Sequence, residues 1–130
     1  ATHWIGVAAR GAGGGSSDVV GAEYWHPLER PNLMVAAKKP HVAKLRKALA
    51  CHVGEVARND YAGRLPAWMS DNVRRGAELV GGAGAVAPKM AYATLYRARI
   101  RTGGKWGVPY RGGRIIAAPE DLRALAAVWN

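Results

Sequence analysis

The sequence predicts an α+β domain, in which a small antiparallel sheet, or meander, packs against two to three helices. Two observations predict this class. Apolar residues recur at helical spacing through residues 40–60 and 66–80, and they alternate with other residues at a period of two through residues 89–118. A shorter helical pattern follows Pro119. We therefore expect helices in the middle of the chain, a meander after them and a short helix last.

The first forty residues predict a different organisation. The run GAGGGSS at positions 11–17 has the composition of a flexible loop. It lacks the Lys-Ser/Thr ending of a phosphate-binding P-loop. Short apolar runs at 4–7 and 33–35 are candidate strands. We expect an extended, Gly-rich N-terminal arm or irregular region at residues 1–40, followed by an α+β domain at residues 41–130.

Residues 40–60 predict one amphipathic helix. Pro40 suits its first turn, where a missing N–H costs nothing. Its apolar stripe recurs every three or four positions and consists of Val42, Leu45, Leu49, Val53 and Val56. Four cations lie off the stripe and are interpreted as a solvated face: Lys44, Arg46, Lys47 and Arg58.

Residues 66–80 predict a second helix. Pro66 suits its start, and Gly81-Gly82 is a signal for its end. Gly76 lowers the helical preference of this segment, since glycine costs about 1 kcal/mol relative to alanine.

The alternating segment predicts strands joined by two turns. Gly103-Gly104 fits a two-residue hairpin turn, and Gly112-Gly113 fits a second turn that leads into residues 114–117. Pro109 makes the middle strand an edge strand. In the first strand, Arg97, Arg99 and Arg101 share one face, because successive side chains of a strand point to opposite sides.

The chain is strongly basic, with a formal net charge of +10 and a pI near 10.4. Such a charge indicates an anionic partner, which is nucleic acid, an acidic protein surface or an anionic membrane. The alternative is a highly soluble protein whose cations face only water. No apolar run approaches ~20 residues, so we expect no membrane-spanning segment. The anionic membrane ranks last of the three partners, and we expect no membrane partner. The single cysteine, Cys51, leaves no intrachain disulfide.

The strongest candidate site is the cationic segment from Arg97 to Arg114, which contains no acidic residue. Its arginines suit phosphates or carboxylates, which they bind through two parallel N–H groups, and its aromatic rings suit stacking on bases. The alternative is that the aromatic rings form the core while the arginines are solvated. The candidate interface or polyanion-binding residues are Arg97, Arg99, Arg101, Lys105, Arg111, Arg114, Trp106 and Tyr110.

No catalytic constellation is visible in the sequence. The four histidines do not fall at the spacing of metal ligands. Cys51 and His52 look like a nucleophile and its base, but neighbours on a helix point about 100° apart. We therefore predict a protein that is not an enzyme, with no catalytic residue, no metal site and no cofactor.

The order of elements, with the segment Gly104-Lys105-Trp106-Gly107-Val108-Pro109-Tyr110, resembles small tailed-phage neck or tail-completion proteins. These proteins often carry a Gly-rich strand pair that ends in Val-Pro-Tyr after a long helix. The resemblance covers residues 41–117 in element order but only Val108-Pro109-Tyr110 in letters. The chain departs from the pattern because it has no Phe, and so no closing Pro-Phe segment, and because its last element is a predicted helix.

The resemblance implies a ring-forming virion component that joins head to tail, and it transfers no catalytic residue. On this hypothesis the chain forms a homo-oligomer, contacts other virion proteins and is assembled in the host cytoplasm. The second hypothesis is a basic nucleic-acid-binding protein of ribosomal or nucleoid type, which would use the Arg-rich hairpin at residues 97–114.

Overall fold

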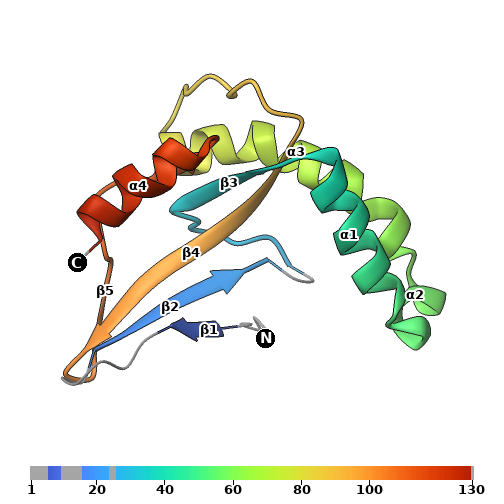
Figure 1. Cartoon of the computed structure of the whole chain (residues 1–130), viewed down its shortest axis with the longest axis horizontal. Helices are drawn as coiled ribbons and strands as arrows, with labels where there is room; N and C mark the ends of the chain where they lie inside the picture. The colour runs from blue at the N-terminus through green and yellow to red at the C-terminus, as the bar shows by residue number, and fades with distance from the viewer. Residues whose placement is uncertain (1–5, 10–15, 24–25, 130) are drawn as a thin grey trace.

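A computed structural model describes residues 6–9, 16–23 and 26–129 and confirms the α+β class (Figure 1). A six-stranded mixed sheet packs against helices on both faces. The strands are β1 (Gly6–Ala9), β2 (Ser16–Ala22), β3 (Leu33–Ala37), β4 (Tyr92–Thr102), β5 (Lys105–Gly107) and β6 (Arg114–Ile116). The helices are α1 (Lys39–Ala50), α2 (Val53–Arg58), α3 (Tyr61–Gly81) and α4 (Pro119–Val128).

The long strand β4 lies at the centre of the sheet, whose order is β1-β2-β4-β3-β6. Figure 1 shows β1, β2, β4 and β3 in this order. Antiparallel β2 covers one edge of β4 from Tyr96 to Thr102. The other edge is shared, because β3 pairs with residues 92–96 and β5 pairs with residues 100–102. The predicted hairpin turn lies between β4 and β5, where Gly103 and Gly104 have φ of 56° and 80°. Positive φ at both central residues is the requirement of a type I′ hairpin turn.

The third strand of the predicted meander is placed differently. β6 does not return beside β5; it pairs in parallel with β3, with Leu33 opposite Arg114. After β5 the chain turns inward, because Pro109 and Tyr110 are buried. Burial of these two residues brings the chain to the start of β3, where β6 begins opposite Leu33. The meander prediction was therefore wrong in its last strand, although the hairpin was right.

The N-terminal region supplies central strands of the sheet. β2 and β3 lie on either edge of β4, so the boundary expected at residue 40 runs through one continuous sheet. Of the glycine-rich run, only Ser16 and Ser17 belong to the described residues, and both begin β2. The candidate strand at residues 4–7 lies partly outside the described residues, and its described part begins β1.

The predicted helices differ in their boundaries. The 40–60 segment forms two helices, α1 and α2, separated at Cys51 and His52. Helix α3 begins at Tyr61 rather than at Pro66, because the carboxylate of Asp60 accepts a hydrogen bond from the Gly63 N–H and so caps the first turn. Four helices therefore lie in the described chain, where two to three were expected.

Pro66 lies inside α3, where it cannot donate to the carbonyl of Ala62 one turn earlier. The side chain of Arg46 on α1 replaces the missing donor, since its Nε–H donates to the Ala62 carbonyl at 3.0 Å. A break in the hydrogen-bond ladder of one helix thus becomes the attachment point of another.

Helix α3 packs closely against one face of the sheet. Its residues Val73 and Val80 form a core with Met34, Ala93 and Leu95. Gly76 makes this approach possible, because a Cβ atom there would lie 2.6 Å from both the Leu95 side chain and the Met34 sulfur. The glycine that weakens the helical pattern of the sequence is therefore required by the contact between helix and sheet.

The short helix α4 covers the opposite face. Leu125 packs with Leu33, Ala98, Tyr110 and Ile116 in a second core. The start of α4 is capped by Asp121, whose Oδ2 accepts hydrogen bonds from the backbone N–H groups of Ala117 and Ala118 at 2.8 and 2.9 Å. These two bonds lower the pKa of the Asp121 carboxyl, because they stabilise its charged form.

Asn32 joins β3, β4 and β6 at the centre of the molecule. Its side-chain amide donates to the Ala98 carbonyl at 3.0 Å, and its side-chain oxygen accepts from the Ala98 N–H at 2.7 Å. Its backbone carbonyl accepts from the Arg114 N–H at 3.0 Å and from the Tyr110 hydroxyl at 3.3 Å. The Asn32 side chain, which is 7% exposed, therefore makes the two hydrogen bonds to β4 that a main-chain N–H and carbonyl would otherwise make.

We expect Asn32→Ala to lower the free energy of unfolding by about 2–4 kcal/mol, because it leaves two buried backbone groups of Ala98 without partners. Urea denaturation followed by circular dichroism measures the change. Asn59→Ala, at an exposed position, is the control and should change stability by no more than about 0.5 kcal/mol. Equal effects of the two substitutions would contradict the structural role of Asn32.

Candidate functional site

The cationic surface begins where the burial of β4 under α3 ends. Ala93 and Leu95 point toward α3 and are fully buried. Arg97 and Arg99 continue along the same face and are half-buried, and Arg101 is exposed. One face of β4 thus changes from core to surface along its length.

Trp106 on β5 organises two of these arginines. It lies opposite Arg101 in the β4–β5 register, and its side chain is 51% exposed. The guanidinium carbon of Arg99 lies 4.3 Å from the centre of the indole ring, and that of Arg101 lies 5.6 Å from it. Both distances are in the range of cation–π contacts. We call Arg99, Arg101 and Trp106 the Arg-Trp cluster.

Arg97 is held differently, by the loop that precedes β3. Its Nη1 donates to the backbone carbonyl of Arg30 at 3.0 Å. The loop and the strand enclose a shallow depression of about 310 Å³, lined by His26, Pro27, Leu28, Glu29, Arg30, Arg97 and Arg99. Arg97 therefore has a structural contact of its own, whereas Arg101 projects into solvent.

The remaining predicted site residues divide into two groups. Lys105 is exposed on β5 beside the Arg-Trp cluster. Tyr110 and Arg111 lie in the segment that leads away to β6, and Arg114 is the first residue of β6. There Nη1 of Arg114 donates to the carbonyls of Arg111 and Gly113 at 2.9 and 3.0 Å, and Tyr110 is buried. The structure thus brings the residues of the β4–β5 hairpin together and places the last three elsewhere.

Tyr110 belongs to the core rather than to a binding surface. Its ring lies 5.5 Å from that of Trp129 between centroids, and the guanidinium carbon of Arg114 lies 5.3 Å from the Tyr110 ring. Burial raises the pKa of the Tyr110 hydroxyl above its ordinary value of 10.0, and the charges of Arg114 and Arg97 oppose this change more weakly.

Titratable side chains do not converge on a metal site in the described part of the chain. Among residues 6–9, 16–23 and 26–129, no group of three His, Cys, Asp or Glu side chains lies close enough to hold an ion. Cys51 is exposed, and its thiol donates to the Lys47 carbonyl at 3.4 Å. Within the same residues, no helix combines the length and the apolar character needed to cross a bilayer.

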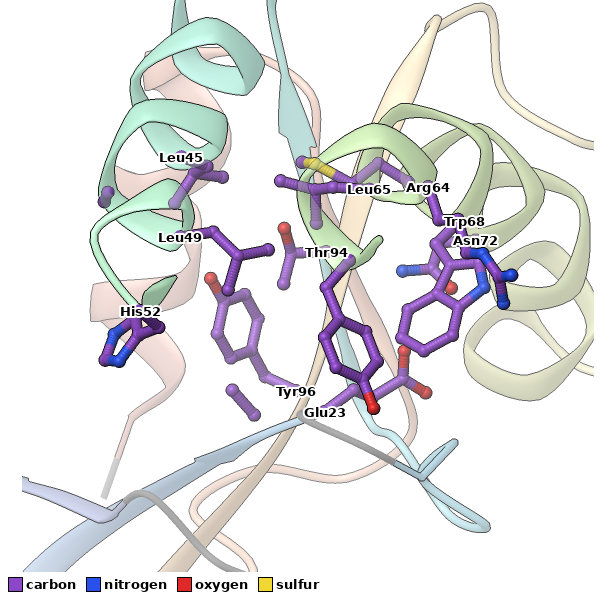
Figure 2. Close-up of a pocket in the computed structure, with 14 residues that line it drawn as sticks. Glu23, Leu45, Leu49, His52, Arg64, Leu65, Trp68, Asn72, Thr94 and Tyr96 are labelled. Carbon is purple, nitrogen blue, oxygen red and sulfur yellow. The ribbon is translucent and has the colours of Figure 1, made fainter. Parts of the chain in front are cut away.

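The sequence did not predict an apolar groove between α1 and α3 (Figure 2). The groove has a volume of about 380 Å³, and its floor includes Thr94 and Tyr96 of β4. Leu45 and Trp68 on its walls are 46% and 48% exposed. Its lining residues are Ala22, Glu23, Leu45, Ala48, Leu49, His52, Tyr61, Arg64, Leu65, Trp68, Met69, Asn72, Thr94 and Tyr96. The apolar stripe of α1 was the signal for it, but a stripe alone does not tell whether a partner element covers it.

A polar network lies beside this groove, where Glu23 and Asn72 line it. Glu23 follows β2 and accepts hydrogen bonds from Nη2 of Arg75 at 2.6 and 2.8 Å. The same nitrogen donates to Asn72 Oδ1 at 2.7 Å, and Asn72 Nδ2 donates to the Ala93 carbonyl at 3.2 Å. Because β2 ends opposite Tyr96, Asn72 takes the place of a neighbouring strand at Ala93.

Compared with models of protein families, with curated proteins and with solved structures, the chain matches none of them.

The raised pKa of Tyr110 predicts a loss of stability at alkaline pH. The folded state binds the phenolic proton more tightly than the unfolded state, so the resulting stability is complete below pH 10 and is lost as pH rises through the folded-state pKa. Tyr110→Phe should remove this contribution. We expect its unfolding free energy to be about 1 kcal/mol lower at neutral pH, where the bond to Asn32 is lost, and to fall less steeply above pH 10. Parallel pH curves for the variant and the wild type would contradict the assignment.

Proposed function

We propose that the chain is a non-enzymatic assembly subunit of the virion-neck or tail-completion type, which binds copies of itself and other virion proteins through the Arg-Trp cluster. The observation that carries the proposal is the exposed half of the β4 face, where Trp106 supports two guanidinium groups. Tryptophan and arginine are the residues most enriched among those that dominate the energy of protein interfaces.

Stacking prepares the arginines for binding. A guanidinium group held over an indole ring loses less side-chain freedom when it meets a carboxylate, and Arg101 of the cluster is exposed to such a partner. The β2 residues opposite Arg97, Arg99 and Arg101 are Gly21, Val19 and Ser17, so β2 places no acidic side chain directly beside these arginines. An acidic patch on a neighbouring protomer or partner would complement this surface.

An exposed apolar side chain that follows the cluster in the chain favours a protein partner. Val108, two residues after Trp106, is 46% exposed. A surface that combines exposed Trp and Val with arginine matches the mixed character of a protein interface.

The Arg99→Ala/Arg101→Ala variant tests the proposal, and it keeps Arg97 because that side chain bonds to the loop at Arg30. Native mass spectrometry of the full chain should show an oligomer for the wild type and a shift to monomer for the variant. Lys47→Ala/Arg123→Ala removes the same charge from exposed positions outside the sheet and should leave the oligomer intact. A wild type that stays monomeric and captures no virion protein would refute the assembly function.

The second candidate function is nucleic-acid binding by the same hairpin. The specific observation in its favour is the density of cations on β4 and β5, within a chain of net charge +10. Phosphates and carboxylates are both good partners for stacked arginines. The two functions therefore differ in their partner rather than in their site.

Salt dependence separates the two candidates. If nucleic acid is the partner, its affinity measured by fluorescence anisotropy should fall by roughly one log-log unit per phosphate contact, and Arg99→Ala/Arg101→Ala should reduce that slope by about two. If the chain is an assembly subunit, binding to DNA and RNA should be negligible at ~150 mM salt, where the phosphate contribution is strongly reduced. A steep salt slope that the variant does not change would place the nucleic-acid site elsewhere.

A further inference from the structure

We propose that the groove between α1 and α3 is a second binding site, which receives an acidic amphipathic segment of another protein. The apolar residues of that segment would lie on Leu45, Leu49 and Trp68, and its carboxylates would meet the cations of the groove rim. This proposal concerns a different surface from the Arg-Trp cluster and does not depend on the function proposed for it.

The apolar character of the groove comes from helical walls and an aromatic floor. Leu45 and Leu49 from α1 face Leu65 and Trp68 from α3, with Tyr96 of β4 below them (Figure 2). The walls are incompletely covered within the monomer, since both Leu45 and Trp68 remain about half exposed. Apolar anchors of an incoming chain would remove this surface from water, which is the usual source of affinity when a helix binds in a groove.

The groove continues along α3 past Trp68. A second depression, of about 180 Å³, is lined by three residues of the first, which are Glu23, Trp68 and Asn72, and by His26, Pro27, Asp71 and Arg75. The two hollows therefore form one elongated surface with Trp68 between them. An elongated and open surface suits an extended or helical peptide segment, whereas a small molecule is usually bound in a more enclosed pocket.

Charge selects the kind of segment. Helix α1 contains four cations and no acidic residue, and Arg64 adds a cation from α3. Nearby carboxylates are already engaged: Glu23 pairs with Arg75, Asp60 caps α3 and Asp71 pairs with Arg74. Lys44 lies one helical turn before Ala48, which lines the groove, and so stands at the rim. An acidic partner is thus complementary to the rim and a basic one is repelled.

Three synthetic peptides test the chemistry of the partner. All carry leucines at helical spacing over about 18 residues, which is roughly 27 Å of helix, and the other positions are all Glu, all Gln or all Lys. Isothermal titration calorimetry with the full chain should show binding of the Glu peptide, about tenfold weaker binding of the Gln peptide and none of the Lys peptide. Equal affinity for the Glu and Gln peptides, or no binding of the Glu peptide, would overturn the proposal.

Matched variants locate the binding. Lys44→Glu/Arg64→Glu should weaken the Glu peptide by at least about tenfold, and so should Trp68→Ala, whose side chain is half exposed and can be removed without opening the core. Lys47→Glu/Arg123→Glu makes the same charge change off the groove, since Lys47 lies roughly 200° around α1 from Leu45 and Leu49. This control should keep full affinity, and Arg99→Ala/Arg101→Ala should keep it as well.

Two results would refute the site even if the Glu peptide binds. In the first, the Lys47→Glu/Arg123→Glu control weakens binding as much as the rim variant does, which would indicate attraction by net charge alone. In the second, vesicles of anionic phospholipid bind the chain and the rim variant abolishes that binding, while the peptide is unaffected. A membrane surface would then be the partner of the groove.

Discussion

Pro31 lies opposite Ala98 when the β3–β4 register is continued beyond Leu33, and proline has no N–H to offer the neighbouring strand. The side chain of Asn32 supplies both the donor and the acceptor that a strand residue at position 31 would have provided. Its main-chain carbonyl then serves β6 and Tyr110. The parallel pairing of β6, the inward path of the preceding loop and the core beneath α4 all converge on this one buried residue.

Short sequence patterns predicted those elements that are determined by neighbouring residues in the chain. The alternation around Arg97 gave β4 its faces, the Gly103-Gly104 pair gave its turn, and Pro119 opens the last helix. The pairing of β6 with β3 was not predictable in this way, because it depends on contacts between Asn32 and residues far along the chain. The early start of α3 was missed because Pro66 resembles a first helical residue, and its compensation lies on another helix.

The candidate site was predictable to the same extent. A period of two and a tight turn are enough to bring Arg99, Arg101 and Trp106 onto one face. Tyr110 and Arg114 belong to the same basic and aromatic segment of the sequence, but they lie away from the Arg-Trp cluster. The chain turns inward after the hairpin, and this turn separates them from it. The groove could not be inferred, since an apolar stripe such as Leu45 and Leu49 has the same sequence whether a neighbouring element covers it or leaves it open.

The bond from Arg46 to the carbonyl that Pro66 leaves vacant has a mechanical consequence for the groove. It joins α1 to α3 beside the opening, at a point where an uninterrupted helix would have had no acceptor to offer. The bond therefore opposes separation of the two helices that form the groove walls. A proline inside a helix removes one internal hydrogen bond, and in α3 the bond from Arg46 offsets this loss. The same bond holds α3 to α1, so the groove between them is formed in part before a ligand binds.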